Sequence, residues 1–221
     1  MFLILHKIFE RIMQSDLDIR ELKRIWTDLE KQLLAFNEII PFERNPHDVY
    51  SPKLINMMLI TGPQIEAMAK LILNKLKLKP KAKGILGHIK EINKNSVLSK
   101  QRIVSLTSGL LFTPFPVKSE WWKSYNLTKH ELFQEIFEIR YQKVMDSMAA
   151  LAALHRIYDA IEKNPKHGKV ILDGKNWVSP TEKTFDEDGA IVIKEVEWPN
   201  TWNSQLFKIT TYYHYVQKPK K

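Results

Sequence analysis

The longest amphipathic pattern in the chain runs from Lys129 to Lys163 and predicts a helix of about nine turns. Its largely apolar stripe follows steps of three and four through Leu132, Phe133, Ile136, Phe137, Arg140, Val144, Met148, Leu151, Leu154, Ile157 and Ile161. Between Met148 and Leu154 the sequence MAALAAL is apolar on nearly every side, and its small alanines allow another helix to approach closely. This stretch is either intramolecular core or the seam of a dimer.

Two further segments have helical spacing. The first, at 15–40, has Ser15 or Asp16 as a cap, ends before Pro41 and carries a stripe of Leu22, Ile25, Trp26, Leu29, Leu33 and Phe36. The second begins with Ser51 and Pro52, a hydroxyl cap followed by a residue suited to the first helical position. Thr61-Gly62-Pro63 predicts a kink or short break in it. A short helix is expected at 85–93 and an extended connector at 102–116.

The pattern changes after Asn164-Pro165. Segments 168–179, 190–198 and 206–216 alternate apolar and polar residues, which predicts two or three strands. The expected fold class is therefore mainly α, an up-and-down helical bundle at 1–164 with a small β-rich extension at 165–221. This extension is a candidate docking element for a protein partner.

The composition excludes several classes of protein. A hydrophobic fraction of 44% is enough for a sizeable core, and the absence of cysteine excludes disulfides and thiol chemistry. No apolar run approaches the roughly 20 residues of a membrane span. We therefore expect a soluble, cytoplasmic protein without a membrane segment. The seven histidines are scattered, and no phosphate loop or dinucleotide fingerprint occurs, so no metal site and no cofactor are predicted.

The formal net charge of +9 is concentrated in one stretch. Between Lys75 and Arg102 there are nine basic residues and a single acid, Glu91. Such a segment attracts phosphate backbones without reading sequence. The candidate nucleic-acid-binding residues in it are Lys77, Lys79, Lys81 and Lys83. The alternative is a solvated loop, because no aromatic side chain lies among these lysines to stack on bases.

The most distinctive side chains gather in EWWKSYNLTKHE, residues 120–131. Asn126 and His130 are four positions apart and share a helix face, with Lys129 beside them. Histidine is the usual general acid or base near neutral pH. In a purely structural interpretation, Asn126 caps the helix, Trp121 and Trp122 fill core space, and His130 satisfies a buried carbonyl.

The order of these features resembles the HEPN-like superfamily of bacterial helical proteins. The resemblance covers roughly residues 16–162 and rests on a long first helix, on YSPKLINMMLITGPQIEAMAKLI, and on WWKSYNLTKHE before a helix containing MAALAALHRIYD. It implies a role with RNA in stress or phage defence, as in the toxins of toxin–antitoxin pairs. It also implies a homodimer joined through the helices that carry the motif.

Catalytic members of that superfamily are metal-independent endoribonucleases whose motif places Arg four to six intervening residues before His. The resemblance assigns proton transfer to His130 and orientation of the phosphate to Asn126. The Arg position is occupied by Tyr125, so charge stabilisation would fall to Lys123 or Lys129, which lack the bidentate guanidinium. Three hypotheses stay open: a ribonuclease, a non-catalytic relative that binds nucleic acid or protein, and a helical dimerisation or partner-binding module.

Overall fold

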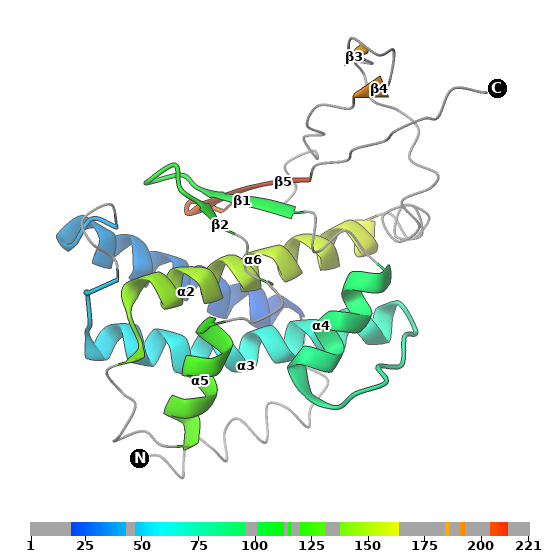
Figure 1. Cartoon of the computed structure of the whole chain (residues 1–221), viewed down its shortest axis with the longest axis horizontal. Helices are drawn as coiled ribbons and strands as arrows, with labels where there is room; N and C mark the ends of the chain where they lie inside the picture. The colour runs from blue at the N-terminus through cyan, green and yellow to red at the C-terminus, as the bar shows by residue number, and fades with distance from the viewer. Residues whose placement is uncertain are drawn as a thin grey trace.

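The computed structural model describes residues 19–42, 47–95, 101–112, 115, 120–130, 138–163, 184–185, 191–192 and 204–211. Its helices are α2 (Ile19–Ile39), α3 (Pro52–Lys75), α4 (Gly84–Asn95), α5 (Glu120–His130) and α6 (Tyr141–Lys163). Its strands are β1 (Gln101–Ser105), β2 (Leu111–Phe112), β3 (Thr184–Phe185), β4 (Ile191–Val192) and β5 (Phe207–Thr211). The described part is mainly helical with a small β component, which confirms the predicted fold class at this level (Figure 1).

Helix α2 buries the predicted stripe. Leu22, Trp26, Leu29, Leu33 and Phe36 are buried, and only Ile25 remains half-exposed. The helix ends at Ile39, two residues before Pro41. The proposed cap at Ser15 or Asp16 lies outside the described residues.

Helix α3 starts as predicted but does not break. Ser51 has extended backbone, and its Oγ accepts a hydrogen bond from the Lys53 N–H at 3.1 Å, with Pro52 in the first turn. The break expected at Thr61-Gly62-Pro63 is absent, because α3 runs through Pro63 to Lys75. Proline removes one backbone donor, and burial of the surrounding turns outweighs that loss. Thr61 also donates its hydroxyl to the Met57 carbonyl at 2.7 Å.

The predicted continuous helix from Lys129 to Lys163 is wrong. Helix α5 ends at His130, and α6 begins only at Tyr141. Arg140 instead forms an isolated antiparallel bridge with Tyr50, and the Tyr141 N–H donates to the Val49 carbonyl at 3.0 Å. An extended backbone at Arg140 cannot belong to a helix. The stripe residues Leu132, Phe133, Ile136 and Phe137 lie outside the described residues.

Helix α6 is the centre of the core. Every residue from Met148 to Leu154 is fully buried. In Figure 1, α3 runs along one side of α6 and strands β1 and β5 lie on the other. The stretch from Met148 to Leu154 is therefore intramolecular core, which was one of the two interpretations of its sequence. It leaves no surface for a second copy, so the predicted dimer seam at this stretch is wrong.

The larger sheet joins distant parts of the chain. It is antiparallel in the order β2-β1-β5, with Ile103 opposite Phe112 on one side and Ile209 on the other. The connector predicted to be extended is thus a hairpin, whose partner β5 comes from the predicted C-terminal extension. Strands β3 and β4 form a separate antiparallel pair. Segment 168–179, also expected to form a strand, lies outside the described residues.

A buried carboxylate holds the beginning of β5. Glu30 of α2 is 6% exposed, and its Oε1 accepts hydrogen bonds from the Ser204 hydroxyl and from the backbone N–H groups of Gln205 and Leu206. Phe207 then packs against Trp26 and Phe112. None of the described helices is both long enough and apolar enough to span a bilayer.

Candidate functional site

Helix α5 sorts the predicted site residues into two faces. Trp121, Ser124, Tyr125 and Thr128 are buried at steps of three and four, whereas Lys123, Lys129 and His130 are exposed and Asn126 is half-buried. Asn126 and His130 do share a helix face, as their spacing predicts. Asn126 lies inside the helix, which begins at Glu120, so the capping interpretation is wrong. His130 is exposed at the helix end, so it does not satisfy a buried carbonyl.

Tyr125, in the position expected for the motif's Arg, lies in the core. It is 3% exposed, and its ring covers Gly62 of α3 so closely that an added Cβ there would come within 2.4 Å of Cε2. Burial raises the pKa of its phenol, and the nearby carboxylate of Glu66 raises it further. The side chain at position 125 therefore points away from the exposed face that carries His130.

The tryptophan pair belongs to the same packing. Trp121 is buried and makes an edge contact with Trp122, with ring centroids 5.7 Å apart. Trp122 in turn lies 5.1 Å from the Tyr125 ring, and Phe115 lies 6.5 Å from that of Trp121. These aromatic side chains dock α5 onto the bundle, which confirms the core interpretation for Trp121 and leaves Trp122 half-buried.

Sequence reasoning missed a polar cluster beside Tyr125. Glu66 and Lys70 form an ion pair one turn apart on α3, with Oε1 and Nζ separated by 3.1 Å. His88 of α4 is 9% exposed, and its buried Nδ1 has no hydrogen-bond partner among the described residues. Burial lowers the pKa of His88, and the nearby Glu66 and Lys70 act on it in opposite directions. The available signals were the i, i+4 pairing and the position of His88 on the apolar face of α4.

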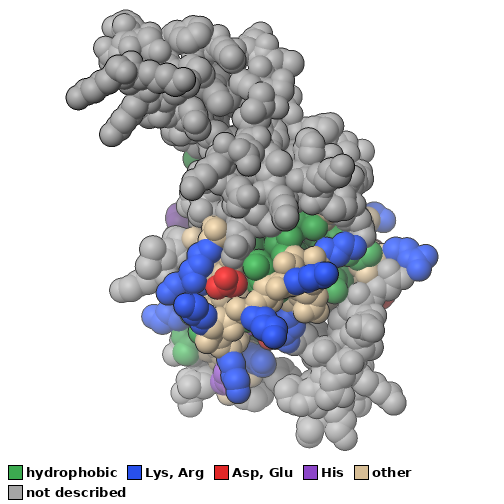
Figure 2. Space-filling view, turned by 90° about the vertical axis from the view of Figure 1, so that its right-hand side faces the viewer, with side chains coloured by type: hydrophobic (Ala, Val, Ile, Leu, Met, Phe, Trp, Pro, Cys, Tyr) green, Lys and Arg blue, Asp and Glu red, His purple; other side chains and the backbone are tan. Residues whose placement is uncertain are grey.

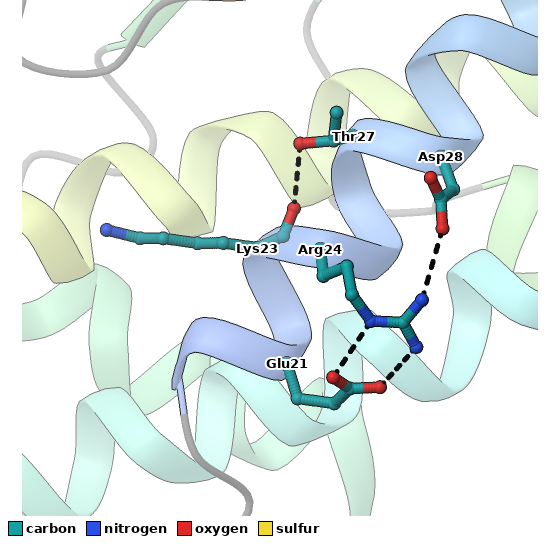
Figure 3. Close-up of polar contacts among 5 residues, drawn as sticks. All are labelled: Glu21, Lys23, Arg24, Thr27 and Asp28. Atoms are coloured by element: carbon teal, nitrogen blue, oxygen red, sulfur yellow. Dashed lines mark hydrogen bonds and ion pairs between the residues drawn. The ribbon is translucent and has the colours of Figure 1, made fainter.

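A second polar set lies between α2 and α6, in which His155 and Asp159 are buried and Lys23 is partly exposed. Lys23 reaches Asp159 of α6, with Nζ and Oδ1 2.7 Å apart. His155 is fully buried near Trp26, and desolvation lowers its pKa to about 3. Figure 3 shows Lys23 extending toward α6, while the neighbouring Arg24 binds Glu21 and Asp28 on the outer face of α2. The ion pair between partly exposed Lys23 and buried Asp159 connects the two helices. Within the described ranges, no three His, Asp or Glu side chains are grouped as a metal site.

The lysines predicted to bind nucleic acid are all exposed. Lys77, Lys79, Lys81 and Lys83 lie on the connection between α3 and α4, and Lys90 continues the surface on α4. In the described part of the chain none of these five has an acidic partner at salt-bridge distance. We call the surface formed by Lys75, Lys77, Lys79, Lys81, Lys83, Leu86, Lys90 and Lys94 the lysine face. Figure 2 shows this side of the molecule, where Lys and Arg side chains surround a hydrophobic patch and acidic side chains are scarce.

Comparison with known proteins identifies no relative: no family model, curated protein or solved structure matches this chain. The resemblance to the HEPN-like superfamily therefore remains a hypothesis based on the sequence.

Proposed function

We propose that this chain is a non-catalytic, HEPN-like protein that binds RNA through the lysine face. The observation that carries the proposal is the set of five exposed lysines on the α3–α4 connection and α4, none of which has an acidic partner among the described residues. A lysine without a partner neutralises phosphate and releases condensed counterions, whereas a lysine already paired with a carboxylate gains much less. The resemblance to HEPN-like proteins supports RNA as the partner and a role in stress or phage defence.

The burial of Tyr125 favours binding over cleavage. Acid–base cleavage of RNA needs a positive group close to the phosphate, and electrostatic stabilisation is commonly the largest catalytic contribution. On α5 the side chain in the Arg position faces the core, while Asn126, Lys129 and His130 face outward. Lys123 and Lys129 supply charge as single ammonium groups only. The lysines add positive charge to the exposed face of α5, but they lack the guanidinium of the motif.

We further propose a homodimer, as the resemblance implies. Because Met148 to Leu154 are buried, the contact must use other surface of the protein. Mass measured in solution at tens of micromolar tests this: a dimer mass is expected, and a monomer mass would contradict it.

RNA binding is tested by fluorescence anisotropy with a labelled mixed-sequence RNA. The variant Lys77→Glu/Lys79→Glu should weaken binding by about tenfold or more and reduce the slope of log affinity against log salt. The control Lys31→Glu/Lys53→Glu makes the same change in net charge at exposed positions of α2 and α3, and should have a much smaller effect. Equal effects of the two variants would show non-localised attraction and contradict the proposed site.

Two further measurements separate RNA binding from its alternatives. Vesicles rich in phosphatidylserine test an anionic membrane as the ligand; binding to vesicles but not to RNA would overturn the proposal. The RNA is also recovered after incubation without metal and examined on a denaturing gel. We expect intact RNA with the wild type and with His130→Ala, and cleavage that disappears in His130→Ala would establish the ribonuclease instead.

A further inference from the structure

The lysines of the α4 part of the lysine face form a straight row. On α4, Leu86, Lys90 and Lys94 follow one another at steps of four, which places them on one stripe of the helix, and Lys83 lies immediately before the helix. All four are exposed, and Leu86 at 61% is the most exposed large hydrophobic residue on α4. At 1.5 Å per residue the stripe from Leu86 to Lys94 is about 12 Å long. Because the helix is a rigid element, the spacing of these charges is set before any ligand binds.

The α3–α4 connection supplies a second row. From Lys75 to Pro80 the exposed lysines alternate with half-buried apolar residues, and Leu76 and Leu78 pack against the core. Lys75 also lies over the ring of Tyr158 of α6, with Nζ 5.9 Å from the centroid. The apolar side chains therefore anchor the connection, and the lysines project from its outer side. Lys83 lies between the two rows, immediately before α4 begins at Gly84.

Two acids described on α3 and α4, Glu66 and Glu91, are paired with lysines. Glu91 of α4 accepts from Lys94 at 3.3 Å, and Glu66 is paired with Lys70. Between Lys75 and Asn95 there is no Phe, Trp or Tyr, and the histidine in this segment, His88, is buried. The lysine face thus offers positive charge and one exposed leucine, with no aromatic surface.

This chemistry distinguishes two kinds of RNA. Proteins that bind single strands place bases on aromatic side chains, which contribute much of the affinity. A double helix keeps its bases stacked inside and presents rows of phosphates, with sugars and 2′-hydroxyls along a wide, shallow minor groove. We propose that the ligand of the lysine face is the backbone of double-stranded RNA, with the two lysine rows on its phosphates. This inference rests on the proposed function and narrows its ligand.

The test compares three labelled ligands of the same sequence: an RNA duplex of about 20 base pairs, which is longer than the lysine rows, one of its strands alone, and the DNA duplex. Anisotropy is measured with the full chain over a range of salt. We expect the RNA duplex to bind about tenfold more tightly than the single strand, with a steep dependence on salt. Lys83→Glu/Lys90→Glu should abolish that preference, whereas Lys31→Glu/Lys53→Glu should retain it.

The outcomes separate this inference from the function on which it rests. Equal or tighter binding of the single strand overturns the duplex as ligand and leaves RNA binding in place. Equal or tighter binding of the DNA duplex overturns the assignment to RNA. No binding of either RNA overturns both proposals. Circular dichroism of each variant, compared with that of the wild type, verifies that a loss of binding is not a loss of fold.

Discussion

At the scale of single residues, Gly62 and Tyr125 make the contact that orients α5. Alanine normally stabilises a helix relative to glycine by about 1 kcal/mol. At position 62 the added methyl would lie 2.4 Å from Tyr125, so we expect Gly62→Ala to lower the free energy of unfolding by about 1 to 3 kcal/mol. Urea unfolding measures this change. Asn56→Ala, at an exposed position of the same helix, is the control and should be neutral or slightly stabilising.

A double mutant tests the cause of that loss. Tyr125→Leu removes the ring from above Gly62, so Gly62→Ala should cost less in the Tyr125→Leu background than in the wild type. Two residues in contact typically show a coupling free energy of about 0.5 to 3 kcal/mol. Strict additivity of the two substitutions would contradict the close packing described here.

Two titratable residues of α6, the fully buried His155 and the half-buried Asp146, give opposite dependences of stability on pH. His155 has a native pKa of about 3, lowered from 6.5 by desolvation, so the unfolded chain binds a proton that the native chain does not. The contribution of His155 to the free energy of unfolding is complete above pH 6.5 and falls by about 1.4 kcal/mol per pH unit as the pH is lowered toward 3. Burial raises the pKa of Asp146 from 3.8 to about 6, so its contribution is present below pH 3.8 and is lost as pH rises to about 6.

The two slopes offset each other between pH 3.8 and about 6. We therefore expect Asp146→Asn to make the free energy of unfolding more sensitive to acid in this window, because the loss at His155 is no longer compensated. His155→Gln should have the reverse effect. Urea unfolding at several pH values, compared with that of the wild type, checks both. An Asp146→Asn curve parallel to that of the wild type would contradict this linkage.

At the scale of secondary-structure elements, the sequence pattern predicted those features that depend on residues close together in the chain. The stripe of α2 and the Ser51-Pro52 start of α3 depend on neighbouring residues, and both were predicted. The separation of α5 from α6 depends on the pairing of Arg140 with Tyr50, a distant contact that periodicity does not contain. The buried face of α5 was likewise hidden, because Gly62 on another helix is what admits the Tyr125 ring. The exposure of the lysines was predictable, because burying several unpaired charges in a core costs too much free energy of desolvation.

The contact between α2 and the start of β5 depends on one carboxylate. Glu30 accepts three hydrogen bonds through Oε1, two of them from backbone N–H groups. Glu30→Ala removes the acceptor of the Gln205 N–H, while the Leu206 N–H keeps Ser204 Oγ at 3.1 Å, and should lower the free energy of unfolding by about 2 to 3 kcal/mol. Glu30→Gln keeps an acceptor oxygen and should cost less. Hydrogen exchange should become faster at Gln205 in Glu30→Ala and change least in the middle of α6, and a uniform change would contradict a local role.

At the scale of the whole molecule, β5 connects the predicted extension to the helical core. It pairs with β1 along its full length, from Gln101 opposite Thr211 to Ser105 opposite Phe207. Phe207 is 4% exposed and contacts Trp26 of α2 and Phe112 of β2. The core of the helical part therefore includes a side chain supplied from beyond residue 164. Stability of the bundle should depend on this strand.

Truncation after residue 203 tests that dependence. Removing residues 204–221 uncovers one edge of β1, leaves Glu30 without its three donors and exposes the aromatic rings that Phe207 covers. We expect the truncated chain to unfold at a lower urea concentration than the full chain. Its free energy of unfolding should fall by at least as much as in Phe207→Ala, for which we expect a loss of about 3 to 5 kcal/mol. The two changes should not be additive, because the truncation already removes the ring. A truncated chain as stable as the full one would mean that 1–164 folds without β5 and that the pairing adds nothing to the core.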